Sequence, residues 1–178
     1  MTFLIRTALV ALLACGAAHA HDTPAPAQPQ SQPAIRVAVS GAVQQPLSLG
    51  ADDLRRFPAD QIVTLTLPGR QAGAPPSVLK GVRLRAVLEQ ARLVIADHNT
   101  VKKLAIIAAA SDGYTVVFSW SELFNAELGD SVLVVFERDG QPLPVAEGPL
   151  ALISGRDLRT GPRHVKWLRS IDVRQIVD

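Results

Sequence analysis

The 178-residue chain is long enough for one domain with a hydrophobic core. Apolar residues make up 48% of it and charged residues 19%, a composition that excludes a fully disordered protein. The formal net charge of +2, from 18 basic and 16 acidic side chains, is too small to predict a nucleic-acid-binding protein, and the sequence has no long basic run.

Residues 1–20 have the features of a signal peptide. Arg6 supplies a positive charge, residues 7–14 form a short apolar run, and residues 18–20 form an A-x-A cleavage site. The run is too short for a permanent transmembrane helix. We therefore expect export to the periplasm and a mature chain that begins near His21.

An alternative prediction concerns Cys15, the only cysteine. It follows Leu-Leu-Ala, so it is also a candidate for acylation in an anchored lipoprotein, and only then do we expect contact with a membrane. If the chain is instead cleaved after Ala20, the mature protein has no cysteine. It then has no disulfide, no thiolate nucleophile and no thiolate metal ligand.

Residues 21–34 are rich in Pro, Ala and Gln and are predicted to be a disordered linker, because nothing in them can bury an apolar face. Residues 35–178 are predicted to form a single domain. Alternation and apolar runs predict strands at 35–40, 61–67, 103–110, 114–118, 131–138, 141–145, 150–154 and 164–173. Helices are predicted at 48–57, 84–94 and 120–127, and a loop rich in Gly and Pro at 68–80.

This order of elements predicts an α+β fold with a mixed β-sheet and short helices. The helix at 84–94 places Leu84, Val87, Leu88 and Ala91 on one core-facing side. The strand at 103–110 is so apolar that we expect it at the centre of the sheet.

The loop between the last two predicted strands carries several cations and glycines, which suit an anion because cations and free N–H groups donate to its oxygens. Its candidate ligand-binding residues are Arg156, Gly161, Arg163, His164 and Lys166.

Two arrangements of this loop remain open. In a regular strand, Arg163 would point to one side and His164 and Lys166 to the other, toward a ligand or toward solvent. Arg156 and Arg159 would either clamp an anion or pair with Asp157 and Glu147 at the surface.

Residues 161–168, Gly-Pro-Arg-His-Val-Lys-Trp-Leu, resemble the G-x-R-x-V-K-W segment of the sulfite-oxidase-like molybdopterin oxidoreductases. Further segments follow in the order of that family: Gly-Val-Arg-Leu at 81–84, Ser-Asp-Gly-Tyr at 111–114, and Asp-Gly-Gln-Pro-Leu at 139–143 before Gly148. The resemblance covers roughly residues 35–175. It implies the sulfite-oxidase-like molybdopterin-binding fold, a pterin-holding role for residues 161–166, and an oxidoreductase ancestry.

The Ser-Asp-Gly-Tyr segment also has a structural interpretation. Asp112 is expected to order its turn through the backbone, and the Tyr114 hydroxyl is expected to find a hydrogen-bond partner.

One departure from the family bears on activity. Catalytic members carry a molybdenum-binding cysteine at the end of the strand that corresponds to residues 61–67, or in the following loop. This chain has Leu67, Pro68 and Gly69 there, and the hydroxyls of Thr66 and Ser77 are poor substitutes for a thiolate. We also find no counterpart of the family's upstream Asn-His segment.

We predict no catalytic residue and no metal site, since His98 and His164 are too few for a histidine triad. The favoured hypothesis is an exported, non-catalytic domain that binds a pterin-like or other small anionic ligand, or a periplasmic protein partner. The alternative is a periplasmic molybdopterin-dependent oxidoreductase, or a subunit of one, with the molybdopterin bound in another way. A structural role at the cell envelope is a third, weaker hypothesis.

Overall fold

The computed structural model describes residues 35–69 and 73–176. The predicted signal peptide, the cleavage site, Cys15 and the linker at 21–34 lie outside these residues, so the predictions about them stay predictions.

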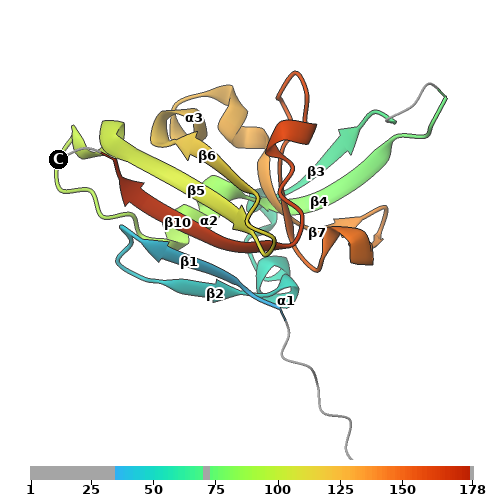
Figure 1. Cartoon of the computed structure of the whole chain (residues 1–178), viewed down its shortest axis with the longest axis horizontal. Coiled ribbons are helices and arrows are strands. Elements are labelled where there is room, and N and C mark those ends of the chain that lie inside the picture. Colours follow the sequence, from blue (N-terminus) through green and yellow to red (C-terminus); the bar gives the residue numbers. More distant parts are fainter. Residues whose placement is uncertain (1–34, 70–72, 177–178) are drawn as a thin grey trace, which may run out of the picture. The chain divides into compact units, whose positions relative to one another are not determined.

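The first of two five-stranded sheets has the order β2-β1-β10-β5-β6 (Figure 1). Its strands are β1 (Val37–Gly41), β2 (Leu47–Leu49), β5 (Leu104–Ala110), β6 (Thr115–Ser119) and β10 (Leu168–Gln175). β1 runs parallel to β10 with Val39 opposite Ile171, whereas the other pairs are antiparallel. The predicted mixed sheet is therefore confirmed, although β10 and not β5 occupies its centre.

The second sheet is antiparallel and has the order β3-β4-β7-β8, with β9 also paired to β7. Its strands are β3 (Ile62–Leu67), β4 (Ser77–Arg83), β7 (Val132–Arg138), β8 (Gln141–Pro142) and β9 (Ala151–Ser154).

The helices are short. The α-helices are α1 (Ala51–Arg55), α2 (Leu84–Ala91) and α3 (Trp120–Phe124). The 3-10 helices are η1 (Ala59–Gln61), η2 (Thr100–Lys103), η3 (Glu127–Ser131), η4 (Val145–Glu147) and η5 (Gly161–Arg163). In the described part of the chain, no helix is long and apolar enough to cross a bilayer. Short helices beside two sheets confirm the predicted α+β class.

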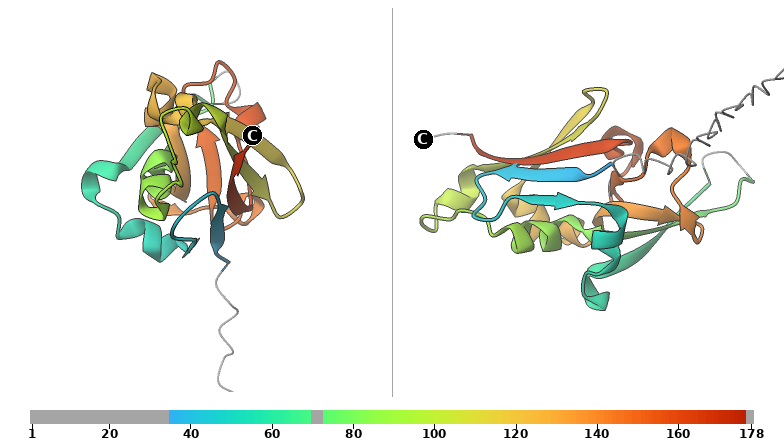
Figure 2. Two further views of the ribbon diagram at one scale, coloured as in Figure 1. Left: turned by 90° about the vertical axis from the view of Figure 1, so that its left-hand side faces the viewer. Right: turned by 90° about the horizontal axis from the view of Figure 1, so that it is seen from below.

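The predicted core face of α2 is confirmed, since Leu84, Val87, Leu88 and Ala91 are all fully buried. They belong to a core that also includes side chains from both sheets, and Figure 2 shows α2 alongside the first sheet. The helix ends at Arg92, which adopts a left-handed conformation with φ of 56°.

Strand β7 is apolar on both faces because it separates two clusters. Val132, Val134 and Phe136 join the main core, whereas Leu133 and Val135 belong to a smaller cluster on the opposite face. This placement explains the continuous apolar run of β7, which is typical of a strand covered on both sides.

Two strands were not predicted. β2 lies where the helix at 48–57 was expected to begin, and β4 begins inside the predicted 68–80 loop. The pairing of β4 with β7 shifts register between Lys80 and Gly81, where the extra residue, Phe136, belongs to β7. The predicted strand at 141–145 is reduced to two residues, because Val145 begins η4.

A candidate ligand-binding loop between β9 and β10

The loop of residues 155–167 connects β9 to β10. Val165 forms an isolated bridge with Leu152, donating to its carbonyl and accepting from its N–H, both at 2.8 Å. Trp167 then adopts a left-handed conformation with φ of 51°, and the regular strand begins only at Leu168. The predicted strand at 164–173 is therefore wrong at its start, and so is the strand-like alternation of Arg163 and His164.

Arg163 lies in η5 and is held by two acidic side chains. Its Nε lies 2.7 Å from Asp157 Oδ2, and its Nη1 lies 3.0 Å from Glu122 Oε1. Its guanidinium also stacks over the ring of Phe118, with Cζ 4.6 Å from the ring centroid. Arg163 thus ties the loop to β6 and to the start of α3.

The electrostatics of this cluster favour the charged forms. The hydrogen bond from Arg163 lowers the pKa of Asp157 despite its partial burial, and Ser154 adds a further bond. Burial raises the pKa of Glu122, but the bonds from the Ser119 backbone and from Arg163 outweigh it and leave that pKa lowered. Conversely, Asp157 and Glu122 raise the pKa of Arg163. The positive charge of Arg163 is therefore neutralised by Asp157 and Glu122 of the same chain.

The other cations of the loop are placed differently. Arg156 pairs with Glu127 at 2.7 Å, and both side chains are largely exposed. The expected partners Asp157 and Glu147 are instead taken by other arginines, so surface pairing occurs with a different acid than predicted. Across residues 35–69 and 73–176, no carboxylate pairs with Arg159 or Lys166. These two cations have charge available for a ligand.

His164 points into the protein. Its side chain is 6% exposed, and its Nε2 lies 3.7 Å from Glu147 Oε2. Both carboxylate oxygens of Glu147 accept from Arg138 Nη2 at 2.9 Å. The structure therefore brings His164 into a buried cluster with an acid and an arginine, away from the exposed cations.

Two glycines, Gly161 in the loop and Gly148 before β9, differ in their surroundings. A Cβ on Gly161 would meet no atom within 4 Å, so the backbone there is open to an approaching ligand. Gly148 has φ of 77°, and a Cβ on it would lie 2.8 Å from Trp167 Cδ2. Gly148 is therefore needed for the fold, since any side chain would strike the indole.

The turn at residues 111–113 supports the same loop. Asp112 Oδ1 accepts from the Tyr114 N–H at 2.9 Å, as expected for an ordered turn. The Tyr114 hydroxyl donates to the Pro162 carbonyl at 2.6 Å, which confirms the predicted bonded hydroxyl. Its side chain remains 45% exposed, so the tyrosine acts as a surface brace on η5.

Sequence reasoning named Asp157 and Glu147 as partners of the wrong arginines and missed Glu122. Glu122 had a detectable signal, because Ser119 and Glu122 have the spacing of a capping box, which the structure contains. The pairing of Arg138 with Glu147 had no such signal, since nothing in their spacing shows that the two side chains meet.

The model of the oxidoreductase molybdopterin binding domain family matches residues 23–176. The chain belongs to this family. The family resemblance carried by residues 161–168 is thereby confirmed, and this molybdopterin-binding-like domain is oxidoreductase-like in ancestry.

Among solved structures, the chain is similar to the sulfane dehydrogenase SoxCD from Paracoccus pantotrophus. The TM-score is 0.60 and the identity 21%, with coverage of 79% of this chain and 38% of that chain. At this identity the likeness shows the fold, and the chain spans well under half of that neighbour. A search of curated proteins finds no match.

A family that binds molybdopterin implies a molybdenum cofactor, and the donor set of this member does not fit the metal. β3 ends at Leu67 and is followed by Pro68 and Gly69, and residues 70–77 contain no cysteine. In the described ranges there is also no group of three or more His, Cys, Asp or Glu side chains that could hold a metal ion. The soft anionic ligand of the catalytic members has no counterpart at this strand end.

Proposed function

We propose that this protein is an exported, non-catalytic member of the family that binds a small anionic, pterin-like ligand at the 155–167 loop. Family membership supports the pterin-like character of the ligand. The missing thiolate supports the loss of redox catalysis, because a hydroxyl or amide at the same place does not hold molybdenum as an anionic sulfur does.

The observation that carries this proposal is the division of cations within the loop. Arg163 is neutralised by Asp157 and Glu122 and fixes the loop in place. Arg159 and Lys166 have no acidic partner in the described structure, and the exposed pair of Arg156 with Glu127 is weak enough to exchange for a ligand. Three cations on a loop with an open backbone at Gly161 are suited to a phosphate-bearing ligand.

In this proposal Arg163 and His164 have a supporting role. They hold η5 and the following residues through Asp157 and Glu147. These two motif residues then hold the loop in its conformation. Arg156, Arg159 and Lys166 contact the anion.

A binding experiment with two matched pterins tests the proposal. The purified protein is titrated with neopterin monophosphate and with unphosphorylated neopterin, and binding is followed by the intrinsic fluorescence of the pterin. We expect the phosphorylated compound to bind more tightly. Replacing Arg159 and Lys166 together by Gln should weaken its binding by about tenfold, since charge contacts near the surface each contribute modestly.

The matched control is Lys102→Gln, which removes an exposed cation on η2 and should leave the affinity unchanged. Equal binding of the two pterins, or unchanged affinity in the double variant, would remove the loop as an anion site.

The second candidate is a subunit of a molybdopterin-dependent oxidoreductase. It is favoured by one observation: the chain has the fold of part of a protein named as a sulfane dehydrogenase, and it spans only 38% of that chain. In that case a partner protein would supply the missing metal ligand. Co-purification with a molybdenum-containing partner would support this candidate over the one above.

Export is the remaining part of the proposal, and it rests on the sequence of residues 1–20. N-terminal sequencing of the protein from the periplasmic fraction should find a chain that begins near His21. A chain acylated at Cys15 would show the lipoprotein alternative instead.

A further inference from the structure

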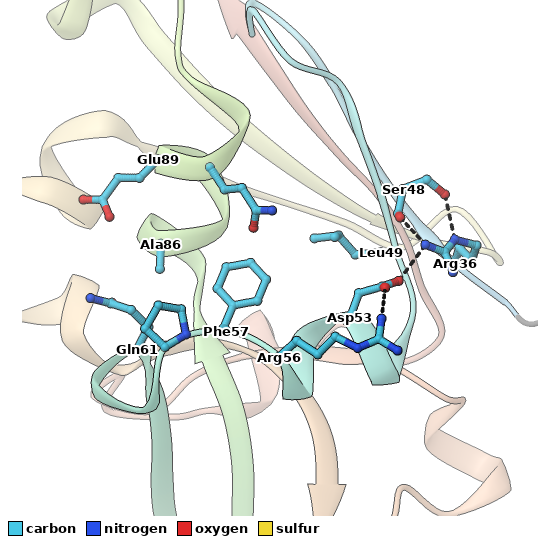
Figure 3. Close-up of a pocket in the computed structure, with 11 residues that line it drawn as sticks. Arg36, Ser48, Leu49, Asp53, Arg56, Phe57, Gln61, Ala86 and Glu89 are labelled. Atoms are coloured by element: carbon cyan, nitrogen blue, oxygen red, sulfur yellow. Dashed lines mark hydrogen bonds and ion pairs between the residues drawn. The ribbon is translucent and has the colours of Figure 1, made fainter.

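A pocket lies between α1, η1 and α2, and none of its lining residues comes from the 155–167 loop. The pocket has a volume of about 600 Å³. This volume lies within the range of small-molecule sites in proteins. Figure 3 shows Phe57 in the middle of the pocket, with Ala86 on one side and Leu49 on the other.

The floor of the pocket is apolar. Leu49 and Ala86 are 8% and 5% exposed, and Phe57 packs against the same core cluster. Leu49 comes from β2, Ala86 from α2 and Phe57 from the residues after α1, so three separate segments form one apolar surface. Such a floor is suited to the hydrocarbon part of a ligand.

On one wall of the pocket, the charged side chains already pair with one another. Asp53 accepts from the Gly50 N–H at 2.9 Å and pairs with Arg36 at 2.6 Å and with Arg56 at 3.1 Å. The Gly50 N–H contributes most to lowering the pKa of Asp53, followed by Arg36. The acid and the two arginines on this side already satisfy one another.

The opposite wall carries an acid without a cation beside it. Gln61 also lines this wall, and its Nε2 donates to Asp60 Oδ2 at 3.0 Å. Glu89 is exposed on α2, and no side chain of the described structure pairs with its carboxylate. Figure 3 shows Glu89 and Gln61 on the same side, with Ala86 between them.

We propose that this pocket binds a small organic cation, namely a primary amine on an apolar or aromatic stem. The ammonium group pairs with the Glu89 carboxylate, which lies at the rim of the pocket. The stem lies on Leu49, Phe57 and Ala86, where the ring of Phe57 also attracts a cation. The site is separate from the loop proposed for anions, so either proposal can fail without the other.

Three ligands of nearly equal size test this proposal: 2-phenylethylamine, 2-phenylethanol and phenylacetate. Each is titrated into the purified protein, and binding is followed by NMR chemical-shift changes. We expect saturable binding of the amine, weaker binding of the alcohol and the weakest binding of the anion. Binding of the alcohol or of phenylacetate as tight as that of the amine, or no saturable binding of the amine, would overturn the proposal.

Two substitutions assign the contacts. Glu89→Gln should weaken the amine by about fivefold, because an exposed ion pair contributes modestly. Ala86→Asp should weaken it as well, because it places a charge on the apolar floor. The matched control is Asp52→Asn, which neutralises an exposed carboxylate on α1 outside the pocket and should change nothing. Unchanged amine affinity in Glu89→Gln, with an unaltered melting temperature, would overturn the assignment.

Discussion

The segment at residues 161–167 and the end of β3 are the two places where the family resemblance implies contact with a cofactor, but they differ in what surrounds them. Arg163 in the first has two acidic partners and an aromatic ring beside it. At the end of β3, Leu67 is followed by Pro68 and Gly69, and the sequence has no thiolate there.

A family motif can be present because it binds the cofactor or because it holds the fold together, and the two regions separate these reasons. The motif around Arg163 has a structural role, since the Arg163 side chain joins Asp157 to Glu122 of α3 and the Pro162 carbonyl accepts from the Tyr114 hydroxyl. A metal ligand has no such second role. A member that loses the metal can therefore retain the loop motif, and the strand end is the better indicator of activity.

The largest expected effect comes from Gly148. Gly148→Ala should lower the free energy of unfolding by about 3 kcal/mol, because the left-handed backbone is strained and the new methyl group meets Trp167. Urea denaturation measures the change. Gly161→Ala is the control, with a change below about 0.5 kcal/mol because the space around it is open. Equal losses in the two variants would show that the segment is not packed as described.

A smaller loss is expected at Arg163. Arg163→Ala should lower the free energy of unfolding by about 2 kcal/mol, since it leaves Asp157 partly buried without its cation. Arg159→Ala, which removes an exposed cation without an acidic partner, should stay within about 0.5 kcal/mol. If both variants were equally stable, the internal network would not be what holds the loop.

The same ion pairs should affect how the free energy of unfolding changes at acid pH. The pKa of Asp157 is lowered in the folded state, so its contribution is complete above the unfolded value of about 4 and is lost as the pH falls through the folded value. The free energy of unfolding should therefore decline below about pH 4. Arg163→Ala should make that decline shallower, and an unchanged slope in the variant would contradict the assignment.

The smallest effect is expected at the surface brace. Tyr114→Phe removes one hydrogen bond to the Pro162 carbonyl and should cost about 0.5–1 kcal/mol. Amide hydrogen exchange at residues 161–165 should rise in this variant. Unchanged exchange there would mean that the hydroxyl does not restrain η5.

Several parts of the fold were predictable because a regular period encodes them. The buried face of α2 follows from helical spacing, and a serine cap on α3 was predicted at Ser119 or Ser121, of which the structure uses Ser119. The family segments at 161–168 also predicted the fold correctly.

Other parts depend on contacts between distant residues. β4 was missed because its first residues follow a stretch rich in Gly and Pro, and its pairing with β3 and β7 joins segments that no local pattern links. Trp167 adopts a left-handed conformation and lies against Gly148, and no local pattern indicates either feature. The pocket around Phe57 likewise required the structure, since three separate segments contribute its floor.

The most direct test of the central claim is the metal and pterin content of the protein isolated from its native host. Elemental analysis gives the molybdenum bound per chain, and fluorescence after oxidation detects the pterin. The absence of a thiolate at the end of β3 predicts no stoichiometric molybdenum, whether or not a pterin is present. One molybdenum per chain in the purified protein would contradict the account.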